Sequence, residues 1–125
     1  MDRILIVDDE FLIRYTLEEG LKDRGYDAYS AATVEEGLEF VRKYHPGVLL
    51  LDNLLENSVG MDEIVNFKNA DEELQVIMMT AYGSVSQAVE ATKRGAYDYI
   101  LKPFDVDEID MLIKRCLEQK RNRDS

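Results

Sequence analysis

Short apolar runs alternate with amphipathic stretches along the whole chain, and this alternation strongly restricts the folds open to it. Runs typical of β-strands lie at residues 3–8, 26–31, 48–52, 74–80 and 97–102. The first, third and fourth runs are apolar at almost every position, as strands are when both faces of their sheet are covered. Strands that alternate with helices pair in parallel through right-handed crossovers. The pattern therefore predicts an α/β protein with a parallel sheet.

The stretches between these runs carry the signals that begin and end helices. A hydroxyl or carboxylate residue followed three positions later by Glu or Gln caps a helix start, and this pattern occurs at Thr33 and Glu36, Ser84 and Gln87, and Asp105 and Glu108. Gly25 follows the first helical stretch, residues 11–24, and a shorter helix is predicted at 61–69. Five βα units in this order predict a doubly wound, three-layer sandwich of the flavodoxin-like type, with strand order 2-1-3-4-5.

Composition and charge narrow the function classes. The chain has 125 residues, 46% of them hydrophobic and 33% charged, which suits one soluble domain that we place at residues 1–118, followed by a polar tail or linker start at 119–125. A net charge of −11 argues against direct binding of nucleic acid, because phosphate contacts need Lys or Arg. We expect neither a membrane span nor a secretory signal. The single cysteine, Cys116, excludes an internal disulfide and fits a cytoplasmic protein.

Three carboxylates follow strands that should be neighbours in the sheet. The first strand ends in Asp8 and Asp9, and the third ends in Asp52. Ligands of such sheets bind beyond the carboxyl ends of the strands, where the strand order reverses, and here that point lies between strands one and three. Carboxylates this close repel one another unless a cation neutralises them. Oxygen ligands favour a hard divalent ion, so we predict a Mg²⁺ site formed by these three residues.

The next two strands add a hydroxyl and an ammonium group to the same edge. The fourth strand ends in Thr80 and the fifth in Lys102, which Pro103 follows. Carboxylates, a metal, a hydroxyl and a lysine together suit phosphoryl transfer, with one carboxylate as the nucleophile. Each residue alone also has a simpler explanation: Asp8 and Asp9 could cap the first helix, Asp52 could be a turn residue, and lysines are usually solvated. The coincidence of all of them at one edge favours the functional interpretation.

Four sequence blocks resemble the signature of response regulator receiver domains, in the same order and at matching spacing. They are ILIVDDE (residues 4–10), VLLLD (48–52), MMTAYG (78–83) and GAYDYILKPF (95–104). The resemblance covers essentially the whole chain. Within the CheY-like superfamily, the segment from Ala81 to Ile109 is most similar to the nitrogen-regulator class of enhancer-binding transcription activators.

The resemblance implies a role for each residue of the site. Asp52 would accept a phosphoryl group from a phosphohistidine of a sensor histidine kinase, and Mg²⁺ would bind Asp9, Asp8, Asp52 and the backbone carbonyl of Leu54. Thr80 and Lys102 would contact the phosphoryl oxygens. The resemblance also implies that Tyr99 is the aromatic residue whose rotamer changes on activation and that the Lys102–Pro103 bond is cis. Residues 84–118 would form a homodimer face. The chain would then be a signalling switch rather than a conventional enzyme, with transcription as its output. The resemblance also favours a chain that is the front part of a longer activator.

One position departs from the family pattern, and two others bear on the lifetime of the phosphorylated state. Glu56 stands where the family usually has proline, so we expect a more mobile loop and an additional carboxylate near the site. Leu54 and Tyr82 flank the expected approach of water to the phosphorylated Asp52. Neither side chain is an acid or an amide that orients water, so the sequence predicts slow loss of the phosphoryl group.

Two other functions compete with the phosphorylated switch. A phosphatase of the dehalogenase type also uses an aspartate at a strand end, but it needs a second Asp two residues later, which Asp8-Asp9-Glu10 and Asp52-Asn53-Leu54 both lack. A receiver that serves only as a docking scaffold would not need its carboxylates. The intact set of site residues argues against that alternative, whereas Glu56 is compatible with it.

Overall fold

The computed structural model describes residues 2–55, 58–81 and 85–124. One parallel sheet contains β1 (Arg3–Val7), β2 (Asp27–Ala31), β3 (Val48–Asp52), β6 (Gln75–Thr80) and β7 (Asp98–Leu101). Its order is β2-β1-β3-β6-β7, which is the predicted order 2-1-3-4-5 when only the strands of this sheet are numbered. The predicted fold class is therefore confirmed.

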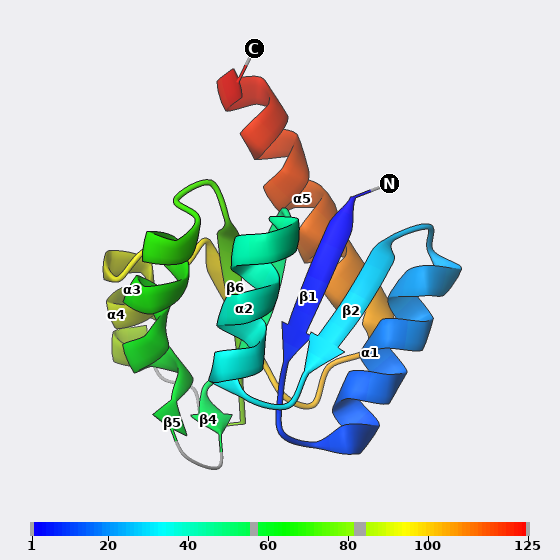
Figure 1. Ribbon diagram of the computed structural model, residues 1–125, viewed down its shortest axis with the longest axis horizontal. Coiled ribbons are helices and arrows are strands. Elements are labelled where there is room, and N and C mark those ends of the chain that lie inside the picture. Colours follow the sequence, from blue (N-terminus) through cyan, green and yellow to red (C-terminus); the bar gives the residue numbers. More distant parts are fainter. Residues whose placement is uncertain (1, 56–57, 82–84, 125) are drawn as a thin grey trace.

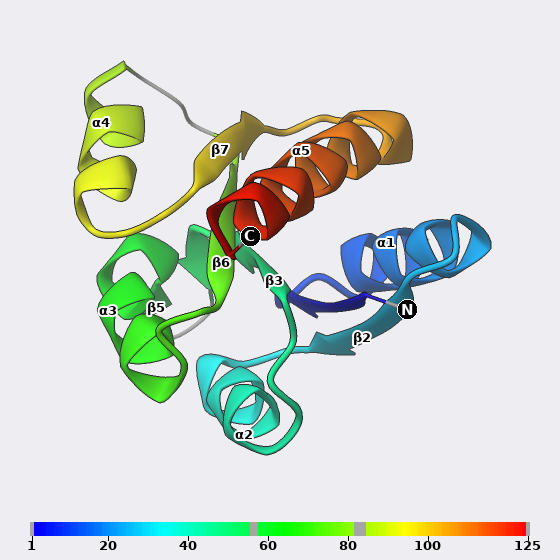
Figure 2. The same cartoon turned by 90° about the horizontal axis from the view of Figure 1, so that it is seen from above.

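Helices cover both faces of the sheet and complete the three layers. They are α1 (Phe11–Asp23), α2 (Val34–Tyr44), α3 (Gly60–Ala70), α4 (Val85–Lys93) and α5 (Val106–Asp124). Seen from above, α1 and α5 lie on one side of the sheet, and α2 and α3, with α4 beyond them, lie on the other (Figure 2). Two hydrophobic cores result, one under each layer of helices.

The central strands are apolar at successive positions because their side chains alternate between the two cores. Along β3, Val48 and Leu50 belong to the core under α1 and α5, whereas Leu49 and Leu51 belong to the core under α2 and α3. All four side chains are fully buried. Burial of each of these apolar side chains stabilises the fold by about 1.5–3 kcal/mol. A polar residue in β3 does not provide this stabilisation, so its presence there needs another reason. Asp52, at the end of the strand, is such a residue.

Helix ends follow most of the predicted signals. The Thr33 hydroxyl accepts a hydrogen bond from the Glu36 N–H at 3.2 Å, and the Asp105 carboxylate accepts one from the Glu108 N–H at 2.9 Å. Gly25 has a φ of 91°, in the left-handed region that glycine adopts without strain, and it follows α1 as predicted. The predicted cap at Ser84 lies outside the described residues.

The loop after β3 contains a feature that the sequence analysis did not predict. Strands β4 (Leu54–Leu55) and β5 (Ser58–Val59) form a small antiparallel hairpin between the end of β3 and the start of α3. The hairpin lies at the edge of the molecule toward which the β1 and β2 arrows point (Figure 1). This position places it at the carboxyl ends of the parallel strands.

The end of the chain is helical, a feature that the prediction of a polar tail or linker start at residues 119–125 did not include. Helix α5 continues through residues 119–124, which are mostly Lys, Arg and Gln and favour a helix. The Lys120 ammonium donates to the carbonyl of Glu73 at 3.1 Å, which holds this last part of α5 near the loop before β6. The domain boundary at residue 118 remains a prediction. Within the described part of the chain, no helix has both the length and the apolar character that a bilayer span requires.

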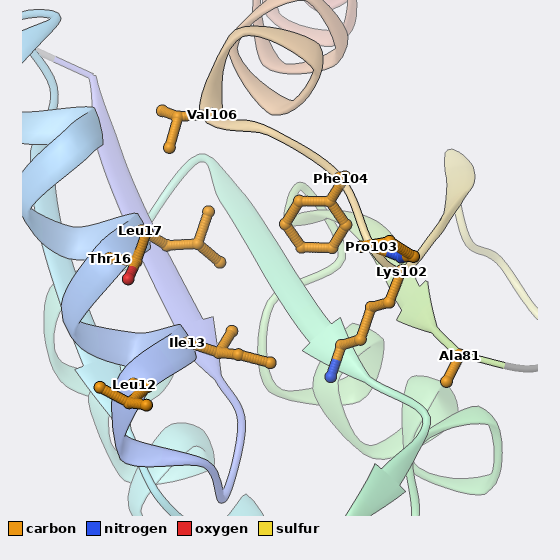
Figure 3. A pocket seen from close by; sticks show the side chains of 9 residues that line it. All are labelled: Leu12, Ile13, Thr16, Leu17, Ala81, Lys102, Pro103, Phe104 and Val106. Atoms are coloured by element: carbon orange, nitrogen blue, oxygen red, sulfur yellow. The ribbon is translucent and has the colours of Figure 1, made fainter.

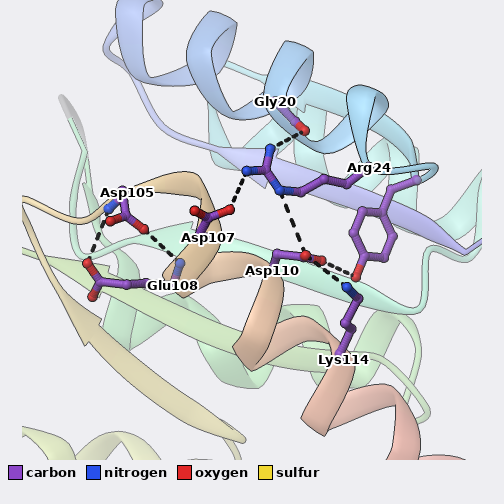
Figure 4. Close-up of polar contacts among 8 residues, drawn as sticks. Gly20, Arg24, Asp105, Asp107, Glu108, Asp110 and Lys114 are labelled. Atoms are coloured by element: carbon purple, nitrogen blue, oxygen red, sulfur yellow. Dashed lines mark hydrogen bonds and ion pairs between the residues drawn. The ribbon is translucent and has the colours of Figure 1, made fainter.

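A polar network joins α5 to the end of α1 (Figure 4). The carboxylate of Asp110, on α5, accepts a hydrogen bond from the Tyr26 hydroxyl at 2.6 Å and pairs with Lys114 at 3.0 Å. Arg24, the residue after α1, pairs with Asp107 and lies 3.8 Å from Asp110. Burial and the hydrogen bond to Asp110 raise the pKa of Tyr26 well above its ordinary value. These contacts fix the first half of α5 against α1.

Candidate functional site

The sheet register brings the predicted carboxylates together. Val7 of β1 is paired with Leu51 of β3, so Asp8 and Asp52 occupy the next positions of two adjacent parallel strands. Both side chains are buried, with 0% of Asp8 and 4% of Asp52 exposed. Oxygen atoms of Asp8, Asp9 and Asp52 all lie within 4.8 Å of one another, while Asp9 is exposed at the rim. The predicted three-carboxylate cluster is therefore present.

Lys102 provides the positive charge that faces this cluster. Its ammonium group donates to the carboxylate of Asp8 at 3.0 Å and to that of Asp52 at 3.2 Å. The side chain is only 14% exposed, because its backbone is held beside the end of β6, where the Lys102 N–H donates to the carbonyl of Thr80 at 2.7 Å. The general expectation of a solvated lysine does not apply here, since the charge is paired in the interior.

The electrostatics of the site raise the pKa of Asp52 to about 6. Burial is the largest cause, and the negative charge of Asp8 adds to it. The Lys102 ammonium and the backbone N–H of Leu54, which donates to the carboxylate, act in the opposite direction. Burial alone would lower the pKa of Lys102, but its bonds to Asp8 and Asp52 raise it, so the amine stays charged. At neutral pH the Asp52 carboxylate is therefore mostly ionised and lies beside the Lys102 ammonium.

Asp8 is held by hydrogen bonds to its side chain and to its carbonyl, and it is not the N-cap residue of α1. Its Oδ1 atom accepts a hydrogen bond from the Glu10 N–H at 2.9 Å, and its carbonyl accepts one from Arg14 at 2.8 Å. Glu10 is the N-cap residue of α1 and makes no side-chain cap. These contacts leave Oδ2 of Asp8 facing Lys102, in the interior of the site.

The donor set fits a divalent cation. Three carboxylates against one ammonium leave an excess of two negative charges when all are ionised. An excess of negative charge within so small a cluster is unfavourable, and oxygen ligands from carboxylates are those that Mg²⁺ and Ca²⁺ prefer. The acidic pocket formed by Asp8, Asp9 and Asp52 could therefore bind such an ion.

The structure places the remaining predicted residues around this centre. Thr80 ends β6 beside β3 and is 2% exposed, and Leu54 begins β4 with its side chain 54% exposed. Tyr99 lies in β7 opposite Met78, and its hydroxyl oxygen is buried without a hydrogen-bond partner among the described residues. The Lys102–Pro103 peptide bond, which the family resemblance implied to be cis, is cis. Glu56 and Tyr82 lie outside the described residues.

Two residues near the site received no role from the sequence. Asn53 and Gly60 stand at the two ends of the β4–β5 hairpin and contact each other through the backbone. An asparagine directly after a buried strand and a glycine directly before a helix are signals that could have drawn attention to them. Their contacts become visible only in three dimensions.

A groove of about 460 Å³ opens beside the cluster (Figure 3). Side chains of α1 line one side and the segment that follows β7 lines the other, and the lining residues are Leu12, Ile13, Thr16, Leu17, Ala81, Lys102, Pro103, Phe104 and Val106. Most of these side chains are apolar. Lys102 belongs both to the groove and to the carboxylate cluster, so the two features are continuous.

Known proteins are similar to this chain in sequence. The chain is 38% identical to sporulation initiation phosphotransferase F of Bacillus subtilis, over 97% of this chain and 98% of that protein. It is 37% identical to the nitrogen assimilation regulatory protein NtrX of Azorhizobium caulinodans, over 96% of this chain but only 27% of that longer protein. Some relatives are thus about the length of this chain, and others extend far beyond it.

Solved structures agree with these relatives. A CheY-like receiver domain protein from Methanospirillum hungatei superposes with a TM-score of 0.92 at 29% identity, over 98% of both chains. The beryllofluoride-activated NtrC4 receiver domain dimer superposes with a TM-score of 0.90 at 34% identity, over 96% of this chain and 99% of that one. The family model of the response regulator receiver domain matches residues 4–114, so the chain belongs to this family of two-component signalling switches.

Proposed function

We propose that this chain accepts a phosphoryl group on Asp52 from the phosphohistidine of a sensor histidine kinase, in a reaction that needs Mg²⁺. The observation that carries this proposal is the position of the Asp52 carboxylate, which is buried, lies beside Asp8 and Asp9, and faces the ammonium of Lys102 at 3.2 Å. The phosphorylated domain then changes conformation and controls an output, which we propose to be transcription.

The chemistry follows from the charges of the site. A carboxylate oxygen of Asp52 attacks the phosphorus, the bond from phosphorus to the donor nitrogen breaks, and an acyl phosphate forms. Lys102 is placed to neutralise negative charge on the transferred group. Asp8, Asp9, Asp52 and the carbonyl of Leu54 would hold Mg²⁺, which supplies further positive charge when bound. The buried Thr80, at the end of β6, is the hydroxyl residue proposed to contact the phosphoryl oxygens.

The apolar groove beside Lys102 suits the donor protein. A donor must bring its phosphohistidine to Asp52. Lys102, which contacts Asp52, also lines the groove, so a donor at Asp52 would lie next to the groove (Figure 3). Leu12 is 72% exposed at this groove, and Phe11 beside it is 67% exposed. Large apolar side chains that lie exposed next to each other are typical of an interaction surface.

A second exposed apolar set supports a homodimer through the proposed face at residues 84–118. Val89 on α4, Leu101 at the end of β7 and Met111 on α5 are 47%, 49% and 62% exposed. The related NtrC4 receiver domain is a dimer in its beryllofluoride-activated form. We propose that phosphorylation of this chain favours a dimer through the corresponding elements.

Acetyl phosphate tests the proposed function without a partner protein. The purified chain is incubated with acetyl phosphate and Mg²⁺, and its intact mass is followed with and without EDTA. We expect the mass of one phosphoryl group to be added, with EDTA preventing the addition. A chain that stays unmodified in Mg²⁺ would support the docking-scaffold alternative instead.

The donor groove has its own test. Leu12→Ser should slow transfer from an autophosphorylated histidine kinase, chosen by profiling a panel of kinases, but leave phosphorylation by acetyl phosphate unchanged. Val65→Ser is the matched control, because Val65 is 54% exposed on α3, outside the groove. Equal kinase transfer to both variants would remove the groove from the donor interface.

A further inference from the structure

Asn53 connects the end of β3 to two other elements through its N–H, its carbonyl and its side-chain oxygen. Its N–H donates to the carbonyl of Met79 at 2.9 Å, and its carbonyl accepts from the Gly60 N–H at 2.7 Å. Its side-chain oxygen accepts from the Met61 N–H at 3.0 Å. The last bond supplies a cap to α3 that Val59, its N-cap residue, does not provide. One residue therefore joins β3, β6 and the start of α3.

Gly60 allows the start of α3 to approach the peptide of Asp52. A Cβ atom at position 60 would lie 2.1 Å from the carbonyl oxygen of Asp52 and 3.0 Å from the Cα of Asn53. Both neighbours are backbone atoms, so any side chain at position 60 has to displace the strand end that carries Asp52. Together with the bonds of Asn53, this close approach forms a clasp, defined here as Asn53 and Gly60.

The clasp closes the hairpin that presents Leu54 to the carboxylate cluster. Leu54 pairs with Val59, directly inside the clasp, and its N–H donates to the carboxylate of Asp52. The Leu54 peptide is thus restrained on one side by Asp52 and at its base by Asn53 and Gly60. The direction of its carbonyl depends on these restraints.

We propose that Asn53 is a positioning residue for the cation and phosphoryl site, acting through the backbone of Leu54. This inference rests on the proposed function, in which the Leu54 carbonyl is a ligand of Mg²⁺. Glu56 stands in this loop where the family pattern has proline. The restraint that proline gives from within a loop comes here from the side-chain amide at its base.

The test compares Mg²⁺ binding across three variants of the chain, measured by titration calorimetry without any phosphoryl donor. Asn53→Ala removes the bond to Met61 and should weaken Mg²⁺ binding about tenfold, the size typical of residues that orient metal ligands. Asn53→Asp keeps an acceptor oxygen at the same place and should restore tight binding. Asn66→Ala is the control, because the Asn66 side-chain amide donates to Glu63 at 3.0 Å on the exposed face of α3, and this variant should bind Mg²⁺ like the wild type.

A purely structural role for Asn53 predicts a different result. In that case Asn53→Ala lowers the melting temperature and leaves the Mg²⁺ dissociation constant within twofold of the wild type, which would overturn the inference. Gly60→Ala should weaken Mg²⁺ binding at least as much, and if that variant does not fold, Asn53→Ala decides. Failure of the wild type to bind Mg²⁺ and to react with acetyl phosphate would overturn the proposed function itself, and the inference with it.

Discussion

The ammonium group of Lys102 donates a hydrogen bond to the carboxylate of Asp52 across 3.2 Å, although 50 positions separate the two residues in the sequence. The same ammonium group reaches Asp8 at 3.0 Å. The single ammonium group of Lys102 thus pairs with two buried carboxylates. This shared pairing opposes the effect of burial, which raises the pKa of Asp52, and makes the site dependent on a single lysine.

Replacement of Lys102 by methionine should destabilise the fold markedly at neutral pH. The carboxylates of Asp8 and Asp52 would then be buried without their cation, and removal of one partner from a buried ion pair costs about 3 kcal/mol or more. Lys22→Met is the control, since Lys22 is half-exposed and its pair with Glu19 is worth at most about 1 kcal/mol. Urea unfolding measures both, and similar losses in the two variants would contradict the pairing.

Stability without a metal should fall as the pH rises through the pKa of Asp52. The folded-state pKa is about 6, above the ordinary value of 3.8, so the folded protein binds this proton more tightly than the unfolded chain. The contribution is fully present below about pH 4 and is lost by about pH 7, with a size on the order of 3 kcal/mol.

Asp52→Asn should remove this pH dependence. The variant carries no titrating group at position 52, so its stability in EDTA should change less than that of the wild type over the same pH range. Mg²⁺ should reverse the trend in the wild type, because it binds the ionised form and stabilises the folded state by mass action. A wild type and a variant with parallel pH profiles in EDTA would show that Asp52 titrates normally.

Much of this site could be predicted from the order of strands and helices along the sequence. Asp52 and Thr80 end their strands, and Asp8 and Lys102 directly follow theirs. Because the carboxyl ends of parallel strands meet at one edge of the sheet, the convergence of these residues was predictable from the pattern of apolar runs. The cap at Thr33 followed from local sequence in the same way. Both kinds of feature depend on spacing and residue type, which the sequence displays.

Other features depend on contacts that no local pattern encodes. The β4–β5 hairpin and the bond from Asn53 to Met61 arise because α3 starts against the peptide of Asp52, a tertiary relationship. The raised pKa of Asp52 needs the depth of burial and the distance to Asp8, neither of which is visible in the sequence. The helical end of α5 was missed because a polar composition is shared by tails and by exposed helices.

The phosphorylated state should last for many minutes or longer once the donor is removed. Leu54, two residues after Asp52, offers water no acid or amide to orient it, and neither does Tyr82, which lies outside the described residues. Leu54→Asn should shorten the lifetime several-fold, because an amide can hold a water near the acyl phosphate. Decay of intact mass with time measures this, and loss of the phosphoryl group from the wild type within seconds would contradict the prediction.

Phosphorylation should change the face built from α4, β7 and α5. Thr80 is expected to move toward the phosphoryl group and Tyr99, whose hydroxyl is already buried, to fill the vacated space. Amide chemical shifts should therefore change most between Thr80 and Phe104, and little at Asp110, which the network with Tyr26 holds against α1 (Figure 4). Changes restricted to the loops that carry Asp8 and Asp52 would argue against a switch on this face.

The identity of the phosphorylated residue is decided by intact mass after incubation with acetyl phosphate and Mg²⁺. The wild type should gain the mass of one phosphoryl group, and the control Asp71→Asn, changed at a carboxylate outside the cluster, should gain it as well. Asp52→Asn should gain nothing, because it retains the fold but lacks the nucleophile. An undiminished mass gain in Asp52→Asn would show that the phosphoryl group is carried elsewhere and would contradict the assignment of this site.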